Sequence, residues 1–127
     1  MNLEELLAWW EGNHKKCLLT FWVLLLLHER PMYALEMGPA VARASRETVV
    51  ADDNSMYRAL RRFERMGIVS STWQDSDLGP QRRYYELTVL GRELLRRFIH
   101  RNILLLQEPD VAARIQAVVT STEERES

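Results

Sequence analysis

The stretch NSMYRALRRFERMGIV, residues 54–69, decides which fold this sequence encodes. Four arginines fall within eight positions of it: Arg58, Arg61, Arg62 and Arg65. At about 100° per residue they share one face of a helix, while Met56, Leu60 and Phe63 lie on the opposite face. The pattern predicts an amphipathic helix that packs its apolar face on a core and offers its cationic face to an anion.

Residues at both ends of this stretch are typical helix boundaries. Asp52 is a favourable N-cap, and Gly67 is a favourable stop. Asn54 and Ser55, in the first turn, share the arginine face. Together with Tyr57 they place polar groups at the leading end of the predicted helix.

A solvated surface helix is the usual explanation of a run of charges. Here only Glu64 interrupts the cationic face, and it lies to one side of it. Because like charges repel, an anion supplied from outside explains the stripe better. The chain has 17 Lys and Arg, 18 Asp and Glu, and a formal net charge of −1, so any contact with nucleic acid has to be local.

Composition indicates one ordinary domain, because the chain has 127 residues and is 46% apolar. The single Cys17 has no partner for a disulfide or a CxxC site, and we expect it to be a buried, reduced thiol in a cytoplasmic protein. The run CLLTFWVLLLL, residues 17–27, is shorter than the roughly 20 residues of a membrane span and predicts a buried helix.

Helical spacing predicts further helices over residues 2–12, 14–28, 32–45 and 88–106, and a last helix from Pro109. Gly12 is expected to end the first of them. The third should carry Leu35, Val41 and Ala42 inward and kink at Gly38-Pro39.

Residues 68–73 and 82–88 are rich in β-branched and aromatic residues and predict two strands joined by the turn 74–81. Tyr84 and Tyr85 should point to opposite faces, one into the core and one to the surface. Trp73, on the first strand, is expected to contribute to packing.

A helix-turn-helix followed by a hairpin that carries Arg82 and Arg83 is the order of a winged helix, whose second helix enters the DNA major groove. The predicted fold class is therefore mainly α with a small β-hairpin wing. The expected organisation is a short amphipathic helix over 1–12, a winged helix-turn-helix domain over 13–88, dimerisation helices over 89–120 and a disordered tail over 121–127.

SMYRALRRFERMGIVSSTW followed by GPQRRYYELTVLG resembles the PadR family of bacterial transcriptional regulators. The resemblance covers about residues 18–106 and implies a dimeric winged-helix repressor, with a dimerisation helix after the wing and with Tyr57 and Arg58 at the DNA. Ala34-Leu35-Glu36 stands where the family usually has Gly-Tyr-Glu, so no role of that tyrosine carries over to Leu35.

The predicted partners are a second copy of the chain and a palindromic double-stranded operator. The helices over 14–28 and 88–106 carry more apolar face than one small domain can cover, which favours a homodimer. The predicted DNA-binding residues are Asn54, Ser55, Tyr57, Arg58, Arg61, Arg62, Arg65, Arg82 and Arg83.

Some members of the resembled family bind flat hydrophobic effectors near the dimer axis, which implies that a small aromatic effector could release the repressor. The candidate effector-binding residues are Trp9, Trp10, Phe21, Trp22 and Phe98. The alternative is that these aromatic residues form the core of the dimer interface.

No catalytic set, phosphate loop or metal-ligand spacing is present in the sequence, so no enzymatic activity, metal or cofactor is predicted. The alternative function is a winged-helix module that binds an acidic protein partner and has no DNA target. The salt dependence of DNA binding distinguishes the two functions.

Overall fold

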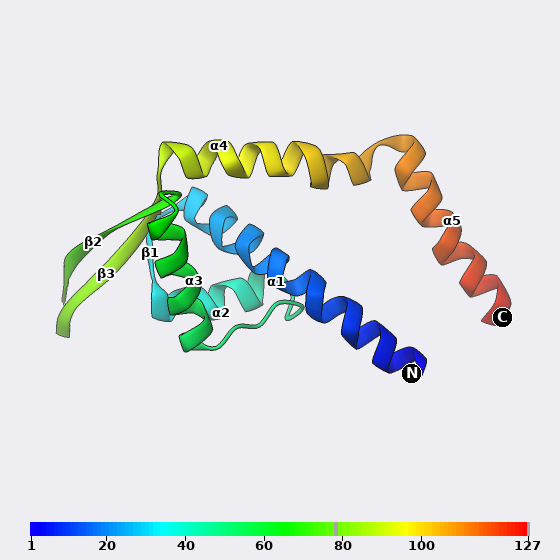
Figure 1. Cartoon of the computed structure of the whole chain (residues 1–127), viewed down its shortest axis with the longest axis horizontal. Coiled ribbons are helices and arrows are strands. Elements are labelled where there is room, and N and C mark those ends of the chain that lie inside the picture. Colours follow the sequence, from blue (N-terminus) through cyan, green and yellow to red (C-terminus); the bar gives the residue numbers. More distant parts are fainter. Residues whose placement is uncertain (78, 127) are drawn as a thin grey trace. The chain divides into compact units, whose positions relative to one another are not determined.

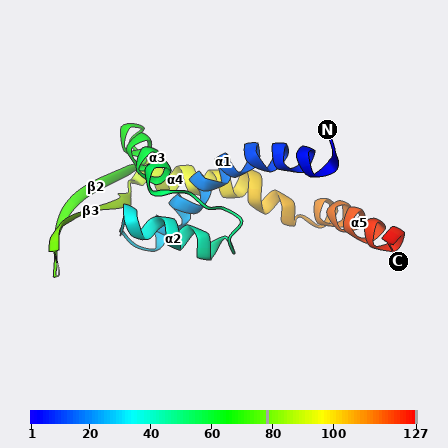
Figure 2. The same cartoon turned by 90° about the horizontal axis from the view of Figure 1, so that it is seen from below.

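The computed structural model describes residues 1–77 and 79–126 (Figures 1 and 2). The chain divides into two compact units, residues 1–93 and 94–127, which are described separately. Within the described residues, the first unit contains three complete helices, a small antiparallel sheet and the start of a fourth helix, and the second contains helical segments. The predicted mainly α fold with a small β wing is confirmed.

The first helix, α1 (Leu3–Glu29), is continuous, so the predicted break at Gly12 is wrong. The Asn2 side chain caps it, as expected. A lone glycine inside a helix costs only about 1 kcal/mol relative to alanine. The ion pair between Glu11 and Lys15, at 3.0 Å, spans the glycine and favours the helix on both sides of it.

A two-residue strand, β1 (Met32–Tyr33), occupies the place where the sequence predicted the start of a helix. It pairs with the far side of the hairpin, Met32 with Tyr85 and Tyr33 with Tyr84. The pairing partner lies about 50 residues away in the sequence, which is why local helical spacing did not reveal it.

The helix α2 (Ala34–Ala44) follows at once and buries Met37 and Val41. Leu35, which was expected to point inward, is 55% exposed, so this prediction is wrong. The inward face starts one residue earlier, at Ala34. The helix runs without a break through Pro39, and the kink expected there stays a prediction.

The helix α3 (Asp53–Arg65) has the predicted boundaries. The Asp52 side chain accepts a hydrogen bond from the backbone of Ser55 at 2.7 Å. At the other end Gly67 has a φ of 79°, and the amides of Gly67 and Ile68 donate to the carbonyls of Glu64 and Phe63. This pair of bonds is a Schellman motif, whose left-handed residue favours glycine.

The wing consists of β2 (Val69–Ser76) and β3 (Gly79–Leu87), and the sheet order is β1-β3-β2. The strands are longer than predicted. They take up much of the stretch expected to be a turn. Tyr85 is buried and Tyr84 is half-buried, which confirms that they face opposite ways.

Packing in the first unit joins α1 to α2, α2 to α3, and α3 to β2. The predicted core positions of α3 are confirmed. The largest fully buried side chains are Tyr85, Phe63, Met37, Met56, Leu60, Val23, Val41 and Val69.

After the wing, α4 (Val89–Phe98) begins where the Thr88 hydroxyl accepts a hydrogen bond from the Gly91 amide at 3.1 Å. The sequence predicted a regular helix as far as residue 106, and this prediction is wrong because the α-helix ends at Phe98. A π-helical segment η1 (Ile99–Ile103) and a 3-10 segment η2 (Leu104–Gln107) follow. In the first of them the Asn102 side chain donates to the Phe98 carbonyl, and such local bonding competes with the regular helical ladder.

The last helix, α5 (Pro109–Glu126), begins at Pro109 as expected. It extends through most of the stretch 121–127, for which the sequence favoured a disordered tail, and residue 127 lies outside the described residues. None of the helices within the described ranges has the length and hydropathy needed to cross a membrane.

Candidate nucleic-acid interface

The arginine face of α3 is exposed along its whole length. Arg58, Arg61, Arg62 and Arg65 all lie in solvent, while Leu60 and Phe63 behind them are fully buried. The core therefore fixes the rotation of the helix and leaves the guanidinium groups outside. This arrangement can meet a polyanion without any change in packing.

The leading end of α3 combines amide, hydroxyl and cationic groups. Asn54, Tyr57, Arg58 and Arg61 line an open hollow of about 320 Å³. The Arg58 side chain also donates to the Ser55 hydroxyl at 3.4 Å. These side chains lie together, as the sequence predicted, and offer donors that suit both phosphate oxygens and base edges.

Asp52 lies beside this cationic end but is committed to capping. Hydrogen bonds from the backbone and side chain of Ser55 lower the pKa of Asp52 below its ordinary value of 3.8. Its carboxylate is therefore ionised at neutral pH and engaged with the amide ends of the helix.

Arg82 and Arg83, grouped together from the sequence, have different surroundings. Arg82 is exposed, and its guanidinium lies 4.4 Å from the centre of the Tyr33 ring. Arg83 is partly exposed and is engaged by Glu64 at 2.8 Å and by the Ser71 hydroxyl at 2.8 Å. Arg82 is thus the more freely exposed of the two, and a DNA contact by either arginine stays a prediction.

A larger hollow of about 520 Å³ lies between the wing, the start of α2 and α3. Its lining includes Tyr33, Leu35 and Trp73, which the sequence did not place at the interface. Trp73 is 63% exposed, so the prediction that it contributes to packing is wrong. It pairs with Arg83 on the part of the hairpin that β1 does not reach.

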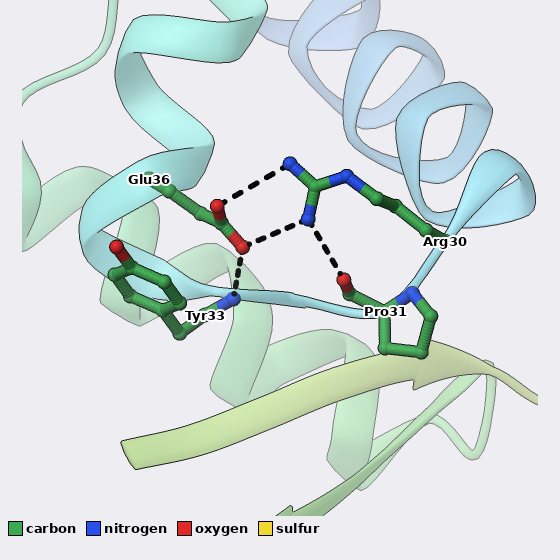
Figure 3. Close-up of polar contacts among 4 residues, drawn as sticks. All are labelled: Arg30, Pro31, Tyr33 and Glu36. Carbon is green, nitrogen blue, oxygen red and sulfur yellow. Dashed lines mark hydrogen bonds and ion pairs between the residues drawn. The ribbon is translucent and has the colours of Figure 1, made fainter. Parts of the chain in front are cut away.

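The position of Tyr33 is fixed by a polar cluster at the start of α2 (Figure 3). Arg30 pairs with both carboxylate oxygens of Glu36, at 3.1 and 3.3 Å, and also donates to the Pro31 carbonyl. The Glu36 carboxylate accepts a hydrogen bond from the Tyr33 backbone amide at 3.1 Å. The hydrogen bond and charge of Glu36 raise the pKa of Arg30. The cluster holds the backbone of Tyr33, and the Arg82 guanidinium lies over the ring of this residue.

The four candidate effector-binding residues on α1 form two separate pairs along the helix. Trp9 and Trp10 are 64% and 69% exposed near the start of α1. Phe21 and Trp22 contact each other edge to face at 5.3 Å, and lie about 18 Å further along the helix at 1.5 Å per residue. Phe98 belongs to the second unit.

Two further expectations concern reactive side chains. Cys17 is exposed, so the prediction that it is buried is wrong for the single chain: it lies in the first part of α1, before the buried residues Val23, Leu24 and Leu27. Within residues 1–77 and 79–126, no three His, Cys, Asp or Glu side chains cluster in a way that could hold a metal ion.

Two helices joined by a short connection, followed by a hairpin beside the second helix, define the winged helix-turn-helix class. The family model of the transcriptional regulator PadR-like family matches residues 23–97. The chain belongs to this family of transcriptional regulators. The resemblance seen in the sequence motifs is thereby confirmed.

Solved structures of the family have the same fold. A PadR family transcriptional regulator from Eggerthella lenta has a TM-score of 0.70 at 22% identity, covering 89% of this chain and 94% of that one. A PadR-like regulator from Bacillus cereus has a TM-score of 0.63 at 22% identity, covering 82% and 93%. Bacillus subtilis PadR, solved in complex with operator DNA, has a TM-score of 0.59 at 16% identity, covering 65% and 46%.

Proposed function

We propose that this chain is a cytoplasmic, sequence-specific DNA-binding transcriptional regulator that acts as a homodimer on a palindromic operator. The observation that carries the proposal is the exposed arginine face of α3, backed by a fully buried apolar face. The operator complex of Bacillus subtilis PadR, a protein of the same fold, supports DNA as the anion.

The positions along α3 suggest a division of labour on DNA. In this proposal Arg58 and Arg61, which line a hollow with Asn54 near the leading end, reach base edges in the major groove. Arg62 and Arg65 meet phosphates along the groove edge. Arg82 extends the cationic surface onto the wing.

A second copy of the chain is the proposed partner because the second unit exposes many large apolar side chains. Exposed large apolar residues there are Leu94, Leu104, Leu105, Leu106, Ile115, Val118 and Val119. Large apolar side chains exposed in this number suit an interaction site, and symmetric dimers are the commonest assemblies of soluble proteins.

We further propose that the regulator is a repressor that a small aromatic ligand releases from DNA. The exposed Trp9 and Trp10 support this part, because exposed tryptophans suit stacking with planar ligands. Fluorescence titration with a panel of planar dyes tests it: quenching together with loss of DNA affinity is expected. Unchanged emission and affinity across the panel would contradict it.

Selection of bound duplexes from a random pool tests the main proposal. A palindrome whose half-sites lie about one helical turn apart is the expected result. A chain with no preferred sequence and no salt-dependent DNA binding would instead favour the alternative, a winged-helix adaptor whose arginines meet an acidic protein.

A further inference from the structure

The wing is a two-stranded hairpin over most of its length. β1 pairs with β3 at Tyr84 and Tyr85, whereas Arg83 pairs with Trp73 of β2 alone among the described residues. Arg83 is thus the first residue of β3 beyond the three-stranded part of the sheet. A two-stranded ribbon is only marginally stable by itself, so its direction depends on what holds it at this point.

A polar network holds the hairpin at this position. Arg83 donates from Nη2 to Oε1 of Glu64 at 2.8 Å and from Nε to the Ser71 hydroxyl at 2.8 Å. The Ser71 hydroxyl in turn donates to Oε2 of Glu64. The network therefore ties both strands of the wing to α3.

The surroundings of this network strengthen it. The Arg83 and Glu64 side chains are 40% and 30% exposed, so they are partly shielded from water. The Arg83 guanidinium also lies 5.7 Å from the ring centre of the buried Tyr85. Both carboxylate oxygens are occupied, and two of the guanidinium nitrogens already donate.

We propose that Glu64 and Arg83 form a brace that fixes the angle of the wing relative to the recognition helix α3, and that Arg83 supports DNA binding as a positioning residue. This inference rests on the proposed DNA-binding function. The brace sets the spacing between the arginines of α3 and the outer wing. Because the pair is electrically neutral, its contribution to counterion release is small.

DNA binding by Arg83→Gln tests the brace. We expect the DNA affinity to fall about two- to fivefold, which is the size of effect that a partly exposed ion pair allows. The slope of log affinity against log salt concentration, here called the salt slope, should stay unchanged. Arg65→Gln is the matched control and should reduce the slope by about 1. A fall of about 1 in the slope of Arg83→Gln would make Arg83 a phosphate contact and overturn the brace.

Hydrogen exchange without DNA tests the brace independently of the proposed function. Glu64→Gln and Arg83→Gln should each speed amide exchange in β2 and β3, while exchange in α2 stays at wild-type rates. The charge swap Glu64→Arg with Arg83→Glu should restore protection, as coupled partners do. Wild-type exchange in both single variants would overturn the brace. If the wild-type protein does not bind DNA but the two variants show these exchange effects, only the proposed function is overturned.

Discussion

The backbone carbonyl oxygen of Ile68 lies so close to Gly91 that a Cβ atom at Gly91 would stand 2.1 Å from it. The same oxygen accepts the Thr88 amide at 3.2 Å, so neither backbone segment can move freely. The start of α4 is therefore held close against the backbone between α3 and β2 by a contact that only glycine permits.

Gly91→Ala should destabilise the fold by about 1–3 kcal/mol or more, because the added methyl group meets backbone and not a flexible side chain. Gly12→Ala is the matched control: nothing lies within 4 Å of its Cβ position, and helix propensity should stabilise the protein by up to about 1 kcal/mol. Urea unfolding followed by circular dichroism measures both. Equal stability of the two variants would contradict the close approach.

Phe63→Ala should cost about 3–5 kcal/mol of unfolding free energy, because it empties a fully buried position. Arg62→Ala, one residue earlier on the exposed face, should change stability by less than about 0.5 kcal/mol. Chemical denaturation of the two variants side by side measures the contrast. A similar loss in both would mean that the arginine face is part of the core.

The N-cap residue of α3, Asp52, makes the free energy of unfolding depend on pH in the acidic range. Because the folded state lowers the pKa of Asp52, its contribution is fully present above the ordinary value of 3.8 and is lost as the pH falls through the folded pKa. Asp52→Ser keeps a cap without the charge. Thermal melts should show wild type more stable at pH 7 and the difference vanishing in acid. A difference that is constant with pH would refute this linkage.

Leu94→Asp and Leu105→Asp should each give monomers that bind DNA weakly, because they place a charge on the exposed apolar surface of the second unit. Leu35→Asp changes a leucine of the first unit that is also exposed, and it should leave the dimer intact. Light scattering at micromolar protein distinguishes these outcomes. A monodisperse wild-type monomer would contradict the proposed homodimer.

Local signals in the sequence predicted α3 well, because its caps and its two faces are properties of one helix. The buried Leu60 and the glycine at residue 67 follow from spacing and turn chemistry alone. The alternation of side chains along a strand likewise predicted that Tyr84 and Tyr85 face opposite sides of the wing.

What the sequence did not reveal depends on partners far along the chain. β1 exists because Met32 meets Tyr85. The surroundings of Arg83 follow from Glu64, 19 residues away, which on a helical wheel is only a charge beside the stripe. The exposure of Leu35 likewise reflects how α2 enters after β1, which a spacing pattern alone does not contain.

The DNA affinity of a triple variant, Arg58→Ala with Arg61→Ala and Arg62→Ala, measured against salt concentration, tests the central claim most directly. Binding should weaken strongly, and the log–log salt slope should fall by about 1, because Arg62 is the phosphate contact among the three and each such contact contributes roughly 0.9. Circular dichroism should show an intact fold, since this face lies outside the core. Wild-type affinity and salt slope in the folded variant would contradict the account and favour a protein partner for the arginine face.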